Sequence, residues 1–246
     1  MGWKIFVHSV RMVLDNLGAA LRVSLLLYLV QVVNQVIVYA SPQIGAASGE
    51  PMQSPAASFE LLIMMILALI ASLWIAVGWH RFVLTGEQPR GVLPHWHGTA
   101  IMSYLGRSIM IGLLLGLGIA VVAGLALGLA TAVPGLVGVV VFGLVGLASY
   151  LFFRIGLILP AAALGERLTL RESWQASGQD DKAILVLALI VMGARLLIEL
   201  PAMIDGSTGT VVSLIYGIVV NWFVTMIGIS VLTTLYGHFV EGRSID

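Results

Sequence analysis

The feature that most constrains this sequence is a series of long apolar runs almost free of charge, such as Leu61–Val77 and Ile109–Ala130. Their length is near or above the roughly 20 residues with which a helix crosses a hydrocarbon core of about 30 Å. Only 10% of the residues are charged, whereas soluble domains carry about 25%. The chain is therefore predicted to be an integral membrane protein.

The solidly apolar character of these runs also predicts how the chain crosses the membrane. Transmembrane β-barrels show segments of about 10 residues that alternate between apolar and polar side chains, and these runs do not alternate. The sequence therefore predicts an all-α polytopic protein in which residues 1–246 form a single membrane domain. Breaks in hydropathy give six predicted transmembrane helices: Leu17–Val38, Phe59–Leu84, Tyr104–Ala130, Gly135–Leu159, Ala183–Met203 and Val211–Gly237.

The connections between these helices differ sharply in charge. Ser41–Ser58 is predicted to be a loop because it holds three prolines with glycine and serine. This loop and the connections Thr131–Pro134 and Ile204–Thr210 contain no lysine or arginine. Eleven of the twelve basic residues fall on the other side: Lys4, Arg11, Arg22, Arg81, Arg90, Arg107, Arg154, Arg167, Arg171, Lys182 and Arg243. Because cytoplasmic loops are enriched in Lys and Arg, both termini are predicted to be cytoplasmic.

The six predicted helices form three hairpins in series, which indicates a weak threefold repeat. A semi-polar stretch precedes each hairpin, namely Trp3–Asn16, His95–Arg107 and Leu170–Lys182. Such stretches are typical of short amphipathic helices that lie in the headgroup layer. The alternative is that any cytoplasmic boundary collects aromatic and basic residues, without a repeat.

Two stretches carry a resemblance to known proteins. Arg154–Pro160 is an Arg–apolar–Pro exit from a predicted helix, and Arg171–Ser177 is a polar stretch that contains Trp174. Together they resemble a group of six-helix bacterial inner-membrane proteins that includes the YciC-like proteins and the membrane domain attached to some glycerophosphodiester phosphodiesterases. The resemblance covers roughly Arg154–Ala194. It implies a helical bundle in a bacterial inner membrane and implies no catalytic residues.

A stripe of small residues runs along the third predicted helix. Its members recur every four residues: Gly112, Gly116, Ala120, Gly124 and Gly128. Small residues at this spacing let helix backbones approach closely in lipid. Three interpretations stay open: packing within the monomer, a face for a partner helix or a second copy, and a glycine-lined substrate path.

Arg195 is the twelfth basic residue and the only one deep inside a predicted helix, and Glu199 follows it at i+4. Residues at this spacing share one helix face. Charges within the membrane are costly and are candidates for function by default. The alternative is a structural ion pair near the outer boundary of the membrane.

The remaining composition argues against several classes of function. Twelve basic and twelve acidic residues balance, so no bulk charge favours a nucleic-acid partner. The absence of cysteine excludes thiolate chemistry and Cys-ligated metals. His95 and His97 are close in sequence but have no matching carboxylate cluster. No nucleotide-binding or hydrolase motif is present, so neither an enzyme nor a cofactor is predicted.

Two functions remain. The first is a non-catalytic accessory, assembly or scaffold component of a membrane complex, with a membrane-protein partner or a homo-oligomer implied. The second is a transporter of small solutes or lipids that uses Arg195 and Glu199. Short loops and small-residue helix faces favour the first of these in the sequence.

Overall fold

The computed structural model describes residues 1–48, 55–89, 91–130, 136–205 and 211–245. Regular structure in this part of the chain is helical, as predicted. Arg90 and the connection Thr131–Pro134 lie outside it, as do residues 206–210. The helices are α1 (Gly2–Asp15), α2 (Leu17–Ser48), α3 (Pro55–Thr85), α4 (Gly98–Ala130), α5 (Val137–Ile155), α6 (Ile158–Leu164), α7 (Leu170–Ser177), the 3₁₀ helix η2 (Gly178–Asp180), α8 (Asp181–Asp205) and α9 (Val211–Phe239).

Five helical stretches within the described residues are long and apolar enough to cross a membrane: Leu17–Ile37, Phe59–Thr85, Gly98–Ala126, Val137–Leu164 and Val211–Phe239. They coincide with five of the six predicted transmembrane helices. The other prediction, Ala183–Met203, corresponds to α8, which is not among the five. The sequence of this helix contains five charged residues: Asp181, Lys182, Arg195, Glu199 and Asp205.

The predicted helix Gly135–Leu159 is broken in the structure, where α5 ends at Ile155 and α6 begins at Ile158. Pro160 explains the break, because it has no N–H to donate to the carbonyl of Gly156. The amide of Leu159 donates a hydrogen bond of 3.0 Å to the carbonyl of Gly156 instead. A Cβ on Gly156 would lie 2.6 Å from the carbonyl oxygen of Phe152, so the turn requires glycine here.

The prediction of a loop at Ser41–Ser58 is wrong at both of its ends. Helix α2 continues to Ser48 and α3 already begins at Pro55; residues 49–54 lie outside the described part. Proline is tolerated in the first turn of a helix, which explains the start of α3. Pro42 removes one hydrogen bond from α2, and good helix formers such as Ala46 follow it.

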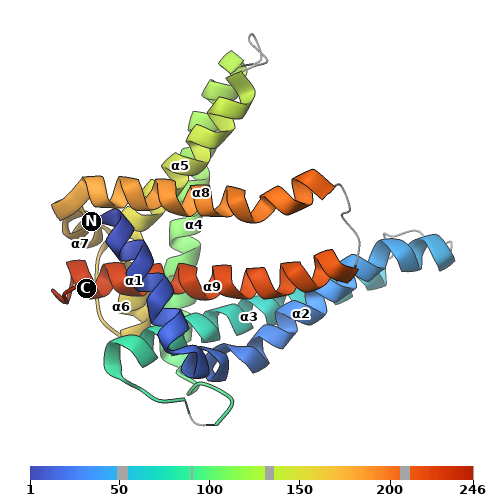
Figure 1. Ribbon diagram of the computed structural model, residues 1–246, viewed down its shortest axis with the longest axis horizontal. Coiled ribbons are helices and arrows are strands. Elements are labelled where there is room, and N and C mark those ends of the chain that lie inside the picture. Colours follow the sequence, from blue (N-terminus) through green and yellow to red (C-terminus); the bar gives the residue numbers. More distant parts are fainter. Residues whose placement is uncertain (49–54, 90, 131–135, 206–210, 246) are drawn as a thin grey trace.

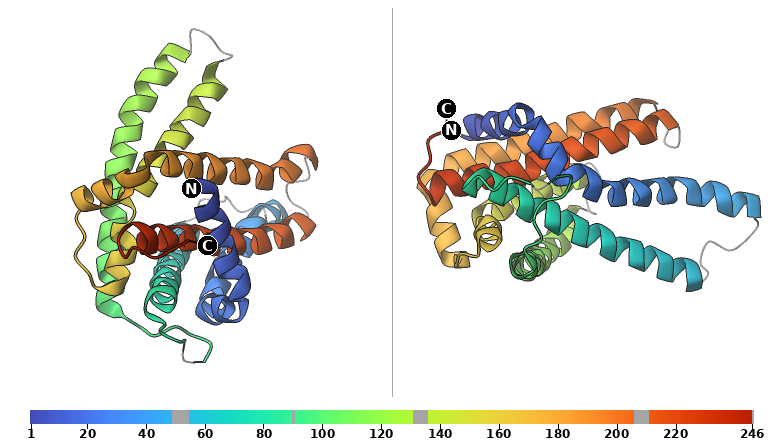
Figure 2. Two further views of the ribbon diagram at one scale, coloured as in Figure 1. Left: turned by 60° about the vertical axis from the view of Figure 1, so that its left-hand side comes forward. Right: turned by 90° about the horizontal axis from the view of Figure 1, so that it is seen from below.

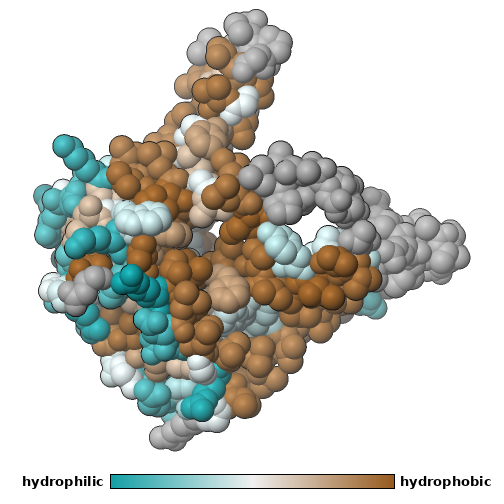
Figure 3. Space-filling view, in the orientation of Figure 1, coloured by the Kyte–Doolittle hydropathy of each residue, from teal (hydrophilic) through white to brown (hydrophobic). Residues whose placement is uncertain are grey.

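The long helices α2, α3, α4, α5, α8 and α9 diverge from one end of the molecule, which we call the base (Figures 1 and 2). Helices α2 and α3 pack on each other, as do α4 and α5, whereas α8 packs on α1 and α5, and α9 on α1, α2 and α3. The base contains α1, α6, α7 and both chain termini. Hydrophilic residues gather there, whereas most of the remaining surface in this view is apolar (Figure 3). Large side chains such as Leu117 and Leu125 are exposed on the diverging helices, which carries no penalty in lipid.

The three stretches predicted to lie in the headgroup layer differ in structure. Helix α1 is separate, and its fully buried residues Ile5, Ser9 and Val13 recur every four positions along one face. This helix packs against α8 and α9. Helix α7 is also separate and short. The middle stretch is not separate, because residues 98–107 form the first turns of α4.

Candidate functional site

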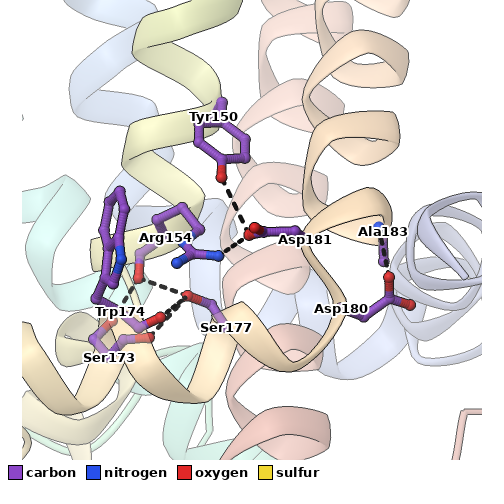
Figure 4. A network of polar contacts seen from close by, with 8 residues as sticks. All are labelled: Tyr150, Arg154, Ser173, Trp174, Ser177, Asp180, Asp181 and Ala183. Carbon is purple, nitrogen blue, oxygen red and sulfur yellow. Dashed lines mark hydrogen bonds and ion pairs between the residues drawn. The ribbon is translucent and has the colours of Figure 1, made fainter.

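A polar network around Arg154 joins α5, α7 and α8 at the base (Figure 4). Arg154 is 4% exposed, and its guanidinium lies 4.2 Å from the ring centroid of Trp174 on α7. It forms an ion pair with Asp181, the first residue of α8. Tyr150 donates a hydrogen bond of 3.1 Å to the same carboxylate. One side chain therefore ties three helices together.

The backbone carbonyl of Arg154 is part of the same network. The last carbonyls of a helix lack partners within it. Ser173 and Ser177 of α7 donate their hydroxyls to this carbonyl at 2.9 Å and 3.0 Å. The stretches Arg154–Pro160 and Arg171–Ser177, which carry the sequence resemblance, are thus in contact through these bonds and through Trp174.

Helix α7 begins with a capping box. The hydroxyl of Thr169 accepts a hydrogen bond from the amide of Glu172, and the Glu172 carboxylate accepts from the Thr169 amide and hydroxyl. These two hydrogen bonds to the carboxylate lower the pKa of Glu172 below its ordinary value. The box fixes the start of the short helix that carries Trp174.

A second set of buried polar groups fastens α9 to α3 and α4. His80 is fully buried, with Nδ1 2.8 Å from the hydroxyl of Thr233 and Nε2 3.4 Å from that of Tyr104. The preceding residue, Trp79, donates to Ser230 at 2.7 Å, one turn before Thr233 on α9. The hydrogen bonds of His80 and Trp79 give partners to polar groups that would otherwise be buried without any. A structural role therefore accounts for His80.

An apolar cleft of about 850 Å³ lies between α5, α8 and α9, and we call it the membrane cleft. Phe6 of α1 and Phe153 of α5 line its end nearest the base. At the opposite end, Tyr216 of α9 donates a hydrogen bond of 3.2 Å to the carbonyl of Ile198 of α8. Only one charged residue, Arg195, is among the described residues that line the cleft.

Arg195 lies toward the end of the membrane cleft that is far from the base. It follows Asp181 by 14 residues in α8, which places it about 21 Å along the helix at 1.5 Å per residue. The predicted partner Glu199 also belongs to α8, but its side chain lies outside the described residues. Arg195 is exposed. Its pairing with Glu199 stays a prediction.

The small-residue stripe lies on an exposed face of α4. Gly112, Gly116, Ala120, Gly124 and Gly128 are all exposed. A Cβ built on any of the four glycines would meet no atom of another element within 4 Å. The close helix approach that such a stripe allows is therefore not seen at these glycines within the described part of the chain.

A second cavity, of about 460 Å³, lies at the base between α3, α4 and the end of α6, and we call it the basic pocket. It is lined by residues that include Arg81, His97, Arg107, Glu166 and Arg167. Sequence reasoning used these arginines only to orient the chain. The three lie on separate elements, so no sequence pattern predicts that they share a pocket.

Glu87 connects two of the residues that line the basic pocket. Its carboxylate accepts from Arg81 Nε at 2.6 Å and contacts His97 Nε2 at 2.7 Å. Partial burial would raise the pKa of Glu87, but the hydrogen bonds from His97 and Arg81 and their charges outweigh it. The pKa of Glu87 is therefore below its ordinary value.

The chain matches no known family model, no curated protein and no solved structure. The resemblance to YciC-like proteins accordingly stays a prediction. Function is inferred here from the geometry of the membrane cleft, the base and the basic pocket.

Proposed function

We propose that this protein is a non-catalytic membrane protein that binds a phospholipid-like amphiphile in the membrane cleft. The hydrocarbon tails lie between α5, α8 and α9, and the anionic headgroup lies near Arg195. The observation that carries the proposal is an apolar cleft whose described lining residues include a single charged one, Arg195, toward one end. This is the lipid-handling alternative of the sequence analysis.

The size and lining of the membrane cleft support an amphiphile. Ligand pockets commonly enclose about 300–1,000 Å³ and combine an apolar lining with a few placed polar groups. The cleft encloses about 850 Å³. Among its described lining residues, only Ser149 and Arg195 have polar side chains. Such a lining offers nothing to a hydrophilic solute along most of its length, which favours a lipid over a small polar solute.

The position of the charge supports the same ligand. The bilayer core is about 30 Å thick, and Arg195 lies about 21 Å along α8 from the base. Guanidinium groups bind phosphate well, because their fork of N–H donors matches its oxygens. A lipid with its phosphate near Arg195 would therefore direct its tails toward Phe6 and Phe153.

We further propose that the base faces the cytoplasm of a bacterial inner membrane and that α8 is a sixth crossing. The charge pattern supports the orientation, because the described basic residues other than Arg195 lie in or next to the helix ends at the base. Both termini lie at the base in Figure 1. The bacterial inner membrane comes from the sequence resemblance alone.

Photocrosslinking tests the proposed ligand. The purified protein is reconstituted with a phospholipid that carries a photoactivatable group on one acyl chain, and labelled peptides are mapped by mass spectrometry. We expect labels on residues that line the cleft, such as Val145 and Ile227. The variant Ala194→Trp fills the cleft and should lose these labels.

Leu197→Trp is the matched control, because Leu197 lies on the same helix, is 67% exposed and does not line the cleft. It should keep the labels of the unchanged protein. Arg195→Gln should weaken labelling by a lipid with an anionic headgroup. Equal labelling in Ala194→Trp and in the unchanged protein would refute lipid binding in the cleft.

The second candidate is the accessory or scaffold role that the sequence favours. The specific observation in its favour is the small-residue stripe, which is exposed and spans about 24 Å of α4 between Gly112 and Gly128. That length is close to the thickness of the hydrocarbon core. A partner helix or a second copy would find room there for close backbone contact.

The two candidates differ in what disulfide crosslinking would capture. The chain contains no cysteine, so Gly116→Cys introduces a single thiol into the stripe. A crosslink to another membrane protein, or to a second copy, from this position but not from Leu117→Cys would favour the accessory role. Absence of any crosslink from Gly116→Cys in native membranes would count against it.

A further inference from the structure

The basic pocket is built from parts that are far apart in the chain. Arg81 comes from the last turns of α3, Arg107 from α4 and Arg167 from the connection that follows α6. The turn at the end of α6 is made by Gly165, whose φ of 80° lies in the left-handed region that favours glycine. This turn brings the Glu166 and Arg167 backbone to the mouth of the pocket.

Backbone carbonyls hold two of these arginines in place. Arg81 Nη1 donates to the carbonyl of Ala163 at 3.2 Å. Arg107 donates from Nη1 to the carbonyl of Ile158 at 2.7 Å and from Nη2 to that of Glu166 at 2.8 Å. Each guanidinium has five N–H donors, so both keep donors beyond those used here. Their orientation is thus fixed before any ligand arrives.

The charges around the basic pocket leave a positive excess. Three arginines line it, and Glu166 is the one acidic residue among its described lining residues. The Glu166 carboxylate accepts a hydrogen bond from the hydroxyl of Tyr236. Glu87 compensates Arg81 and contacts His97. Arg107 is bound to carbonyls in the described structure, which do not neutralise its charge.

The position of the basic pocket in the fold favours a lipid phosphate. It adjoins the base-side ends of three candidate spans, Phe59–Thr85, Gly98–Ala126 and Val137–Leu164. Basic pockets between transmembrane helices are known to bind anionic headgroups. The positive-inside rule explains why arginines are common at this end. It does not explain why three of them line one cavity, or why backbone carbonyls hold the donors of two of them, Arg81 and Arg107.

We propose that the basic pocket is a binding site for a phosphate group, carried by an anionic phospholipid headgroup or by a free phosphate compound. Arg107 and Arg81 provide preorganised donors, and Arg167 closes over the phosphate from the exposed rim. This site is separate from the membrane cleft, whose charged residue Arg195 lies about 21 Å along α8 from the base. It goes beyond the proposed function and does not depend on it.

Arg167 gives the sharpest test, because it is exposed and holds no other part of the described fold together. Arg167→Gln is compared with Arg171→Gln, since Arg171 is also exposed, lies four residues further on and does not line the pocket. Both variants are made in the Ala194→Trp background, in which the membrane cleft is filled. Native mass spectrometry from a neutral detergent then counts retained phosphatidic acid and phosphatidylcholine.

We expect Arg167→Gln to weaken retention of phosphatidic acid by about fivefold, as for one basic residue near a lipid surface. Arg171→Gln should leave it unchanged, and retention of phosphatidylcholine should be weak in all variants. Calorimetric titration with glycerol phosphate and with inorganic phosphate separates the sources. Binding of these compounds with the same dependence on Arg167, and displacement of the lipid, identifies a free phosphate ligand.

Two results would overturn the proposal. One is equal loss in Arg167→Gln and Arg171→Gln, which would reduce the effect to general surface charge. The other is the same retention of phosphatidic acid in Arg167→Gln and in its parent, with no Arg167-dependent binding of either free phosphate compound. Circular dichroism of each variant shows that the fold is kept, so neither result follows from unfolding.

Discussion

The contact between α5 and α7 leads to a prediction about Ser173 and Ser177. Both hydroxyls are fully buried and lie within hydrogen-bond distance of the Arg154 carbonyl. Ser177 Oγ also lies 2.8 Å from the carbonyl of Ser173. A hydroxyl has one proton, so Ser177 shares its single donor between the carbonyls of Arg154 and Ser173, whereas Ser173 donates to the carbonyl of Arg154. Each serine therefore acts as a reserve donor for the other.

The two substitutions should consequently be strongly non-additive. Either Ser173→Ala or Ser177→Ala removes one donor and should cost about 1 kcal/mol. In each single variant the Arg154 carbonyl still accepts a hydrogen bond from the hydroxyl of the other serine. The double variant leaves this buried carbonyl without either serine, and an unsatisfied buried group costs about 1–3 kcal/mol. Because neither single variant incurs this penalty, the double loss should exceed the sum of the single losses by about 1–3 kcal/mol.

Equilibrium unfolding in mixed micelles of a neutral detergent and dodecyl sulfate measures the free energy of unfolding of each variant, with tryptophan fluorescence as the signal. Ser244→Ala is the control, because Ser244 is exposed and should change stability little. A double-mutant cycle with losses that simply add would refute the reasoning. It would mean that the two hydroxyls stabilise α7 independently rather than through one shared carbonyl.

Three further predictions concern packing, charge and capping at the base. Gly2→Ala should destabilise the fold by about 1–3 kcal/mol, because its Cβ would lie 2.4 Å from the Ala183 carbonyl oxygen. A Cβ at Gly18 meets nothing within 4 Å, so Gly18→Ala should instead raise the thermal midpoint slightly. Because the pKa of Glu87 is lowered in the fold, the stability that this carboxylate contributes is complete above the ordinary carboxyl pKa. That contribution is lost as the pH falls through the lowered pKa of the folded protein. The protection factors for hydrogen exchange in residues 86–89 and 91–97 should therefore fall as the pH is lowered through this range, and Glu87→Gln should remove that dependence. Thr169→Val should cost about 1 kcal/mol by removing the cap of α7, whereas Thr169→Ser should keep the thermal midpoint.

Hydropathy predicted five of the helical stretches that are long and apolar enough to cross a membrane, because the requirement to satisfy every backbone group in lipid leaves few alternatives. It did not predict every bound, because α2 continues ten residues beyond its predicted end and α4 begins six residues before its predicted start. It missed the break between α5 and α6, although Pro160 and Gly156 mark it in the sequence. A proline four residues after a glycine within an apolar run is the signal that would have revealed it.

The arrangement of the helices was less accessible from the sequence. Hairpin order predicts that α8 and α9 are neighbours, but it does not predict that they enclose a cleft with α5 and Phe6. The basic pocket was missed for a similar reason. Its arginines are contributed by α3, α4 and the connection after α6, and only the fold brings them together.

The distribution of polar contacts explains how a clefted shape can be stable in lipid. Apolar helix faces gain little from packing on one another there, because lipid tails are equally apolar. Hydrogen bonds and ion pairs must then supply the specificity of contact. Along α2, α3 and α9 such bonds continue away from the base, as Gln31 donates to Ser72 at 2.7 Å and Tyr28 to the carbonyl of Ile218 at 2.9 Å. The pair α4–α5 is held mainly through Arg154 and Arg107 near the base, and the membrane cleft opens between α5, α8 and α9 farther from it.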